Sequence, residues 1–523
     1  MGTLVRCYPG RVRTIIEALD RAQATFGDRP AVETEDEVVT YAELAEMVEG
    51  AAERLVDEGL NPGDRLAVCL DNGLDIIVAI WACARAGLLF VGLSNRLQPP
   101  QWAWMLRHCG AALVLCHPAY LEGVQEAAAE AGLDADRARP VTDHLTGRRL
   151  PWRGAAVPFP DEDDVYGMVY TSGTTGRPKA SQLVHRATMH SAIAYVRILG
   201  LTDDDRTAIV FPLYYVTGHV AQVTPMMLVG GASVPVREVV PSDLVRVMGE
   251  RRITYLMVVP SLWPLLLRVA EFRWPDLAHV QVGAFGGSPV PISTVAALRE
   301  RMPQLRLFDA YGLTETHSPA TVLLDAEFRR KPGSVGRPVP CAETRVVGDD
   351  GCDVEPGRPG ELWVRGPMVT SGYFRDPDAT AAAITDGWLH TGDWVRIDDE
   401  GYVFILDRKK DMIMRGGFKV YSVELEYLLV SHPDIAEAAV FGVPDTLAFE
   451  TVAAYVVPSS GCTIEPAAVK QWVGARMADF AVPRYVRVVD TIIRNRTGKV
   501  DKMALRRALL AELETRRAES ASY

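Results

Sequence analysis

The order of apolar and polar residues predicts alternating strands and helices over the first 290 residues. Residues 11–28 are predicted to form a helix, because apolar residues recur at the helical period at Val12, Ile15, Ile16, Leu19 and Ala22. Residues 31–34 and 38–40 form a predicted hairpin, and Thr40 then caps a helix that begins at Tyr41 and ends near Gly59. Short apolar runs typical of buried parallel strands occur at 66–70, 89–92, 113–116, 209–211, 254–259 and 280–285. We therefore expect an α/β fold with βαβ units around parallel sheets.

The pattern changes after about Gly333. Short β-type segments separated by Gly, Asp and Pro follow at 344–347, 360–364, 394–397 and 403–406, and predict a small antiparallel portion. The charged stretch Asp407–Asp411 then interrupts the apolar pattern and marks a hinge. We divide the chain there into an N-terminal domain, residues 1–408, and an α+β domain, residues 409–523. In the second domain we expect helices at 423–429 and 467–477, strands at 435–443 and 451–457, and a frayed tail at 516–523.

Bulk composition narrows the class of protein. A chain of 523 residues is too long for a single core, and a net charge of −12 without a Lys/Arg-rich cluster argues against a nucleic-acid binder. The 8 cysteines are scattered without a CxxC pair, which predicts reduced thiols and a cytoplasmic location. The first residues lack the apolar core of a secretory signal, and no apolar run approaches the ~18 residues of a membrane span.

Residues 170–179 read Tyr-Thr-Ser-Gly-Thr-Thr-Gly-Arg-Pro-Lys and follow a predicted strand. The glycines allow the backbone to approach a ligand closely, and neighbouring N–H groups can form an anion-binding nest. Two residues separate Gly173 from Gly176, and Lys179 comes three residues later, so the spacing is not that of the Walker loop. The groups that predict a polyphosphate-binding loop are Thr171, Ser172, Gly173, Thr174, Thr175, Gly176, Arg177 and Lys179.

This segment resembles the phosphate loop of the adenylate-forming superfamily, which comprises acyl- and aryl-CoA ligases, adenylation domains of peptide synthetases, and luciferases. Further segments that resemble the family's signatures follow in the family's order, so the resemblance covers nearly the whole chain. It implies that ATP and Mg²⁺ activate a carboxylic acid to an acyl-adenylate with release of pyrophosphate. Coenzyme A is then the expected acceptor, and a small C-terminal domain rotates between the two half-reactions.

Residues 309–316, Asp-Ala-Tyr-Gly-Leu-Thr-Glu-Thr, resemble the family's YGxTE motif. The resemblance implies that Tyr311 faces adenine, that Thr314 contacts the α-phosphate, and that Glu315 is a Mg²⁺ ligand. Thr175 of the phosphate loop is the second expected metal ligand. Residues 285–290, Phe-Gly-Gly-Ser-Pro-Val, follow a predicted strand and are expected to lie along adenine and the acyl group.

Three later segments complete the resemblance. Asp393, in a Thr-Gly-Asp string, is expected to accept both ribose hydroxyls. Arg408, in the hinge segment 407–419, is expected to reach the ribose or the α-phosphate, with Lys410 at the pivot. Gly416 and Gly417 form the loop that would line a pantetheine tunnel, and Lys499, in residues 495–501, would place a charge between the carboxylate and the α-phosphate.

Together these motifs give three sets of expected site residues. The catalytic set is Thr171, Lys179, Glu315 and Lys499. The nucleotide set is Thr171, Ser172, Gly173, Thr174, Thr175, Gly176, Lys179, Gly286, Gly287, Ser288, Asp309, Ala310, Tyr311, Gly312, Thr314, Asp393, Arg408 and Lys499. The acid-pocket set is Tyr214, Tyr215, Gly218, His219, Val259, Gly286, Gly287, Tyr311, Gly312 and His317.

The chain departs from the family pattern at two places that bear on the acceptor. Residues 211–218 match the PLxHxxG segment except that Tyr215 stands where many CoA ligases carry His, and Ser422 replaces the usual Pro after the hinge loop. Transfer of the acyl group to CoA is the first expectation for a fatty or aromatic acid. Transfer to an amine or to a carrier-protein thiol, and a nucleotide-binding scaffold without chemistry, are the alternatives. The sequence leaves a homodimer open.

Overall fold

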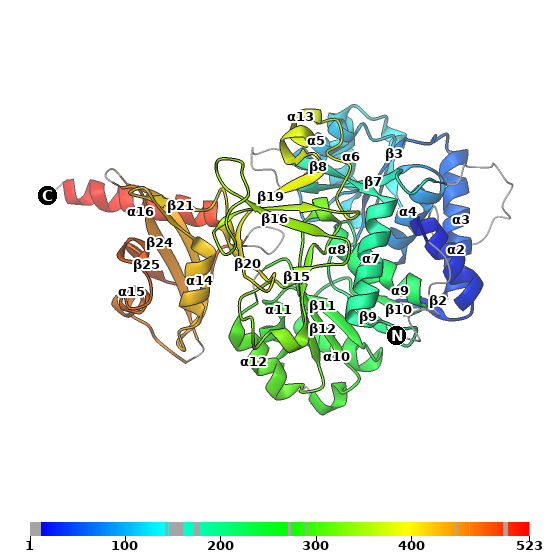
Figure 1. Ribbon diagram of the computed structural model, residues 1–523. Helices are drawn as coiled ribbons and strands as arrows, with labels where there is room; N and C mark the ends of the chain where they lie inside the picture. The colour runs from blue at the N-terminus through cyan, green and yellow to red at the C-terminus, as the bar shows by residue number, and fades with distance from the viewer. Residues whose placement is uncertain are drawn as a thin grey trace.

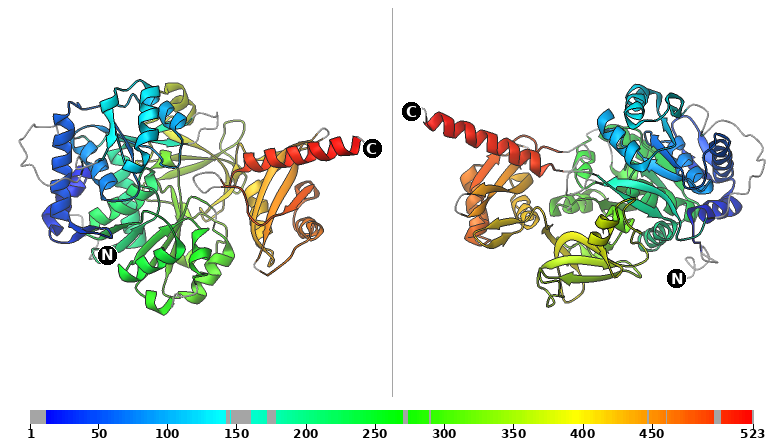
Figure 2. Two further views of the ribbon diagram at one scale, coloured as in Figure 1. Left: turned by 180° about the vertical axis from the view of Figure 1, so that it is seen from behind. Right: turned by 90° about the horizontal axis from the view of Figure 1, so that it is seen from above.

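The computed structural model describes residues 12–141, 145, 160–171, 178–269, 274–288, 290–445, 448–459, 461–494 and 500–521. A large unit, blue to yellow in Figure 1, lies beside a smaller unit in orange and red. The two views of Figure 2 show the same separation, with the yellow segment β20 at the junction. The predicted mixed α/β fold, with an antiparallel portion and a small α+β unit, is confirmed.

The large unit is built on two sheets that are mostly parallel, as their apolar strands predict. The nine-stranded sheet has the order β15 (Arg337–Pro338), β14 (Thr321–Leu323), β13 (Arg306–Tyr311), β12 (Val282–Gly286), β11 (Tyr255–Val258), β9 (Arg206–Ile209), β10 (Ala232–Pro235), β1 (Pro30–Glu33) and β2 (Val38–Thr40). The six-stranded sheet has the order β6 (Ala138–Pro140), β5 (Leu113–Cys116), β3 (Arg65–Cys69), β4 (Leu89–Gly92), β7 (Val165–Thr171) and β8 (Lys179–Val184).

One hydrophobic cluster joins the two sheets through the helices packed against them. It contains Leu66 from β3, Tyr255 from β11, Ile77 from α4 (Leu74–Arg85) and Ala192 from α7 (His185–Leu199). Helix α4 is apolar on all sides and buried from Ile76 through Ala84, as expected of a helix enclosed by protein. The two sheets therefore share one core, and their strand ends keep fixed positions relative to each other.

Helices follow the predicted boundaries closely where a cap is encoded. The Thr40 hydroxyl accepts from the backbone N–H of Glu43, and the Glu43 carboxylate accepts from the backbone N–H of Thr40. These two hydrogen bonds form a capping box at the start of α3 (Tyr41–Asp57). The other long helices of the large unit are α2 (Ile15–Phe26), α5 (Pro99–Cys109), α6 (Leu121–Ala131), α10 (Pro241–Glu250) and α12 (Ile292–Arg301).

Two smaller sheets are antiparallel. The first contains β16 (Glu343–Val347), β17 (Gly360–Arg365), β18 (Ile384–Thr385), β19 (Trp388–Ile397) and β20 (Val403–Arg408). The sheet of the small unit contains β21 (Ile413–Arg415), β22 (Phe418–Val420), β23 (Ile435–Asp445), β24 (Phe449–Pro458) and β25 (Tyr485–Val488), with only β25 parallel to its neighbour. Helices α14 (Ser422–Val430), α15 (Pro466–Gly474) and α16 (Lys502–Ala521) complete this unit.

Three predicted elements differ from the structure. The strand expected at 209–211 lies at Arg206–Ile209: past Ile209 the Phe211 carbonyl accepts from the Asn72 side-chain amide, and Pro212 has no N–H to continue a ladder. Strand β19 begins six residues before the predicted start at Trp394, so Asp393 lies within a strand and not in a turn. The prediction of a frayed tail at 516–523 differs from the structure as far as Ala521, to which α16 continues, and residues 522 and 523 lie outside the described residues.

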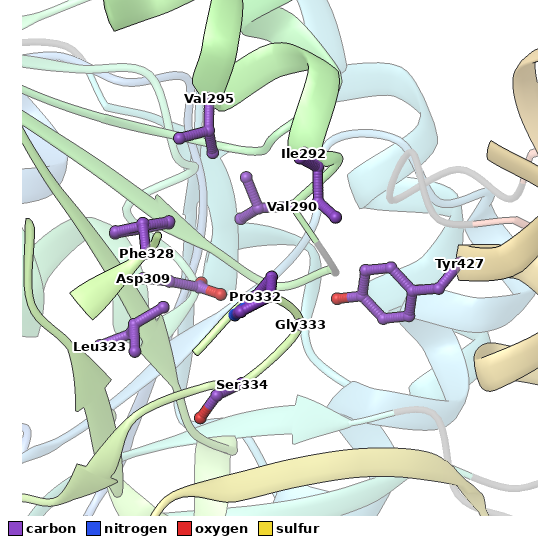
Figure 3. Close-up of a pocket in the computed structure, with 10 residues that line it drawn as sticks. All are labelled: Val290, Ile292, Val295, Asp309, Leu323, Phe328, Pro332, Gly333, Ser334 and Tyr427. Atoms are coloured by element: carbon purple, nitrogen blue, oxygen red, sulfur yellow. The ribbon is translucent and has the colours of Figure 1, made fainter. Parts of the chain in front are cut away.

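A small cavity of about 30 Å³ lies where the small unit meets the nine-stranded sheet (Figure 3). Asp309, near the end of β13, points its carboxyl group into the cavity, and Tyr427 of α14 points its hydroxyl toward it from the other unit. The remaining walls are mostly apolar, and Asp309 is 5% exposed. Burial raises the pKa of Asp309 to about 8, so its carboxyl group is mostly protonated near neutral pH.

We predict that Asp309→Asn stabilises the protein, and more strongly as the pH rises from about 5.5 to 8. Below the ordinary pKa of 3.8 the carboxyl group is neutral in both states. Above it, only the unfolded chain ionises until the pH reaches about 8, so wild-type stability falls across this window. At 1.36 kcal/mol per pH unit, the advantage of the variant grows by up to about 3 kcal/mol. Denaturant unfolding of both proteins at the two pH values measures this difference, and a pH-independent difference would contradict the assignment.

Candidate active site

Thr171 and Lys179 frame the loop that the sequence assigned to polyphosphate. Thr171 ends β7 and Lys179 begins β8, and the two residues face each other in an antiparallel register. The Thr171 hydroxyl donates to the Lys179 carbonyl at 3.4 Å. The loop residues Ser172, Gly173, Thr174, Thr175 and Gly176 lie outside the described residues. The structure therefore fixes the two ends of the loop.

Lys179 and Glu315 are linked by Tyr373. The Lys179 ammonium lies 4.9 Å from the centre of the Tyr373 ring, and the Tyr373 hydroxyl donates to Glu315 Oε1 at 2.8 Å. Glu315 lies in a short 3₁₀ turn, Thr314–Thr316, and its carbonyl accepts from Thr370 N–H at 2.8 Å. The cation and the carboxylate that were predicted from separate motifs are thus brought to one place, although they are 136 positions apart in sequence.

Three neighbouring parallel strands deliver the expected adenine and acid residues to one edge of the large sheet. Strands β11, β12 and β13 pair in register, and Gly286 lies opposite Ala310. Val259 and Gly287 directly follow their strands, and Tyr311 ends β13. Ligands of open α/β sheets bind at such carboxyl ends, so the position fits a binding site. Gly287 has φ of +83°, which the turn after β12 requires.

Asp393 is the central buried charge of the site. It is 2% exposed, and its Oδ2 accepts from the Tyr311 hydroxyl at 2.5 Å. Its Oδ1 lies 2.6 Å from Nε of Arg408, which is the residue opposite it in the β19–β20 ladder. This arrangement ties the large sheet, the antiparallel sheet and the last strand before the hinge to one carboxylate.

Charged groups from several separate segments of the chain act on the pKa of Arg408. Burial lowers this pKa, but the nearby Asp393 carboxylate and other negative groups, among them Glu315, outweigh burial and raise it overall. Arg408 is therefore a cation in contact with the expected ribose ligand, Asp393, and within electrostatic range of the expected metal ligand, Glu315. A nucleotide held there would have its phosphates close to fixed positive charge.

The donor set suits Mg²⁺ held mainly by substrate oxygens. Among the described residues there is no group of three or more His, Cys, Asp or Glu side chains that could hold a metal ion by itself. Mg²⁺ commonly uses one or two carboxylates together with substrate phosphates and water. Glu315 provides such a carboxylate, linked through Tyr373 to Lys179, and its Oε2 accepts no hydrogen bond from the described part of the chain. The residues present therefore fit a magnesium–nucleotide complex.

The predicted acid-pocket segment packs between the two large sheets. Tyr214 donates to Asn95 Oδ1 at 3.1 Å and is almost fully buried, while the adjacent Tyr215 is half-buried. Gly92 allows this close approach, because a Cβ there would lie 2.6 Å from Tyr214 Cβ. Gly218 similarly passes against the backbone of residues 211–213. Of this segment, Tyr215 has the more accessible side chain.

His219 and His317 differ from the expectation that they line the acid pocket. Both are 0% exposed. His219 Nε2 lies 3.1 Å from the Tyr166 hydroxyl, and His317 Nε2 accepts from Val184 N–H at 3.0 Å. Burial lowers the pKa of His219 to about 4 and that of His317 to about 3, so both are neutral. In this structure they are core residues that brace the segments around the site.

The hinge segment connects the two units through a buried polar cluster. Asp407 is 0% exposed and accepts from both the backbone N–H and the hydroxyl of Ser422, the latter at 2.8 Å. The Lys502 ammonium donates to the Ser422 hydroxyl at 2.6 Å and pairs with Glu426 at 2.8 Å. Proline at position 422 could not supply either donor. Ser422, which stands where the family usually has Pro, therefore makes contacts between the end of β20 and the small unit.

Lys410 is exposed in the turn between β20 and β21. The other hinge-loop residues lie at the opposite end of the β21–β22 hairpin. Gly416 and Gly417 are exposed with φ of +58° and +88°, and Gly416 N–H donates to the Ala448 carbonyl at 2.8 Å. Lys499 lies outside the described residues, but Lys502 places the start of α16 against Asp407.

Tyr373, Tyr427 and Lys502 contribute to the site region and were not predicted from the sequence. Tyr373 lies in a Gly-Tyr-Phe string, Tyr427 in an apolar helix and Lys502 at the start of a charged helix. Each contact partner is more than 50 positions away in sequence or in the other unit, so no local pattern indicated these roles.

Known proteins resemble the chain over almost all of its length. Residues 19–374 match the family model of AMP-binding enzymes, and residues 424–499 match the model of the AMP-binding enzyme C-terminal domain. Indoleacetate–CoA ligase of Aromatoleum aromaticum is 35% identical over 498 residues, which cover 93% of this chain and 96% of that protein.

Solved structures agree with the sequence relatives. The o-succinylbenzoate CoA synthetase of Bacillus subtilis, in complex with an acyl-adenylate intermediate, superimposes with a TM-score of 0.81 at 28% identity and covers 93% of this chain and 97% of its own. The amide bond synthetase McbA of Marinactinospora thermotolerans gives a TM-score of 0.86 at 28% identity, with 95% and 99% covered. The chain belongs to the AMP-binding enzyme family, the adenylate-forming superfamily whose signatures its sequence carries in order.

Proposed function

We propose that the protein activates a carboxylic acid with ATP and then transfers the acyl group to coenzyme A. The observation that carries the proposal is the convergence of Lys179, Glu315 and Arg408 with Asp393 around one strand-end site. The relatives named above include CoA ligases, which supports the same reaction class. We further propose that the enzyme is cytoplasmic, because its thiols are free in the described residues.

In the first half-reaction, a carboxylate oxygen of the acid forms a bond to the α-phosphorus, and the bond from that phosphorus to the β-phosphate bridge oxygen breaks. Two anions must approach each other, so positive charge and orientation are the main requirements. Asp393 would hold the ribose hydroxyls, with Tyr311 against the base, while Arg408 and Lys179 supply fixed positive charge. Bound Mg²⁺ would neutralise charge on the phosphates, with Glu315 as its protein ligand.

Two segments of the small unit bear on the two half-reactions. Lys502 anchors the start of α16, which in sequence follows the segment that carries Lys499, through the Ser422 hydroxyl to Asp407 at the hinge. Gly416 and Gly417 instead lie at the far end of their hairpin, next to Ala448. We propose that rotation at Lys410 exchanges these two segments, so that the glycine loop would line the thiol path in the second half-reaction.

Fatty or aromatic acids are the proposed substrate class, with the indoleacetate-activating relative favouring an aromatic ring. Tyr215 is half-buried, and Val259 is 36% exposed at the adjoining strand end, so the pocket candidates are apolar to aromatic. The amide bond synthetase neighbour supports an amine as the second candidate acceptor. Transfer to a carrier-protein thiol is the third.

A screen over fatty, benzoic and indole acids tests the proposal directly. We expect acid-dependent pyrophosphate release in the presence of Mg-ATP, and an acyl-CoA product by mass spectrometry when CoA is added. Parallel reactions with amines or a carrier protein identify the alternative acceptors. Absence of pyrophosphate release with every acid would contradict the activation step. An amide product without a thioester would show that an amine, and not CoA, is the acceptor.

Lys499→Ala is expected to slow the first half-reaction by roughly 10²–10³-fold or more, which is the scale for loss of a preorganised electrostatic donor. Acid-dependent exchange of pyrophosphate into ATP measures that half-reaction in isolation. Lys470→Ala, which alters a lysine of the same unit on the surface helix α15, serves as the matched control and should leave the exchange unchanged. An unchanged exchange rate in Lys499→Ala would remove that lysine from the mechanism.

Lys410→Pro is expected to spare pyrophosphate exchange and to slow acyl transfer to CoA, because proline fixes φ at the proposed pivot. Lys410→Ala removes the same side chain without restricting the backbone, and it should preserve both half-reactions. Single-turnover transfer from preformed acyl-adenylate measures the second step. Equal loss of both steps in Lys410→Pro would show that position 410 is not a pivot for alternation.

A further inference from the structure

Tyr373 lies between Lys179 and Glu315, the two charged groups that we propose face the nucleotide phosphates. Its ring is 4.9 Å from the Lys179 ammonium, and its hydroxyl donates to Glu315 Oε1 at 2.8 Å. Because an ionised carboxylate oxygen can only accept, the phenol is the donor in this contact. One aromatic side chain therefore contacts both the cation and the carboxylate.

The backbone around Tyr373 is held firmly against β8. Phe374 N–H donates to the Ala180 carbonyl at 2.8 Å, and Gln182 N–H donates to the Gly372 carbonyl at 3.0 Å. Tyr373 N–H donates to the Thr380 hydroxyl at 2.9 Å. Gly372 has φ of +135°, and a Cβ there would lie 2.5 Å from Thr380. The phenol is thus placed by the same strand that begins with Lys179.

Glu315 is fixed at both of its ends by this segment. Thr370 N–H donates to the Glu315 carbonyl at 2.8 Å, while Tyr373 occupies Oε1. Within the described part of the chain, only Oε2 of the carboxylate remains without a hydrogen bond. A carboxylate held in this way can offer one oxygen to a metal ion without losing its orientation.

We propose that Tyr373 is a positioning residue that holds Glu315 as a one-oxygen ligand for nucleotide-bound magnesium and sets its separation from Lys179. This inference rests on the proposed function. The reason is coordination geometry: Mg²⁺ requires near-octahedral ligands at about 2.0–2.1 Å, whereas Ca²⁺ accepts carboxylates through both oxygens at about 2.3–2.6 Å. Occupation of Oε1 by a hydroxyl disfavours the two-oxygen mode. Tyr373 therefore contributes to selectivity for the smaller ion.

The decisive variant is Tyr373→Phe, which keeps the ring beside Lys179 and removes only the hydroxyl. We expect weaker Mn²⁺ binding in the complex with a non-hydrolysable ATP analogue, by roughly 10-fold, the scale of a hydrogen bond to a charged group. Electron paramagnetic resonance of Mn²⁺ measures this without turnover. Competition by Mg²⁺ and Ca²⁺ should show a Mg²⁺ preference that falls relative to wild type. Unchanged affinity and unchanged preference would overturn the proposal.

Tyr402→Phe is the matched control, since Tyr402 donates to Glu327 and has the Lys331 ammonium 4.8 Å from its ring centre, away from the site. It should leave Mn²⁺ binding unchanged. Glu315→Gln with and without Tyr373→Phe completes a double-mutant cycle. If Tyr373 acts through Glu315, the phenylalanine substitution has no further effect on metal binding once Glu315→Gln is present, and an undiminished effect there would overturn the proposal.

Two measurements separate this inference from the proposed reaction. Mn²⁺ binding with the ATP analogue needs no acid substrate, so it reports on Tyr373 even if no acid supports pyrophosphate exchange. Thermal unfolding of Tyr373→Phe in the absence of nucleotide shows whether the fold is retained. If that variant does not fold, Tyr373→Leu, whose side chain carries no hydrogen-bond donor, takes its place in the same Mg²⁺ and Ca²⁺ competition; a preference equal to wild type there would also contradict the proposal.

Discussion

The buried Asp393 carboxylate is the interaction on which the rest of the site depends. It receives the Tyr311 hydroxyl from the large parallel sheet and the Arg408 guanidinium from the strand that leads to the hinge. A carboxylate that is 2% exposed requires such partners, because an isolated charge in that position would be costly. The same pair of contacts fixes the antiparallel sheet against the end of β13. Asp393, the proposed ribose ligand, and the strand that leads into the hinge are thereby one structural unit.

The phosphate end of the site is organised by a second set of contacts, centred on strand β8. Lys179 begins this strand, and residues 370–374 pair along it and deliver Tyr373 to Glu315. The Lys179 cation, the proposed metal ligand Glu315 and the phenol between them are therefore spaced by backbone hydrogen bonds and not by flexible side chains alone. Electrostatic catalysis gains most from groups whose positions are fixed before the reaction.

The small unit is attached directly beside the Asp393 contacts, because Asp407 precedes Arg408 in β20. The Asp407, Ser422 and Lys502 cluster joins the last strand of the large unit to α14 and α16, and Tyr427 closes the Asp309 cavity from the same side. Burial raises the pKa of Asp407 to about 6, so its ionised form relies on the donors of Ser422 and the charge of Lys502. Rotation of the small unit would have to exchange these contacts, which links the proposed second half-reaction to a specific polar cluster.

Local sequence was sufficient for the fold class, most strands and helices, and the motif residues. Apolar runs such as 66–70 and 113–116 encode buried parallel strands, the Thr40–Glu43 cap encodes the start of α3, and the family signatures identified Lys179, Glu315, Asp393 and Arg408. Tertiary structure alone decided which groups meet: Tyr373 with Glu315, Ser422 with Asp407, and the burial of His219 and His317 in the core. The physical reason is that periodicity and caps act over a few residues, whereas these contacts join side chains that become neighbours only when separate sheets pack.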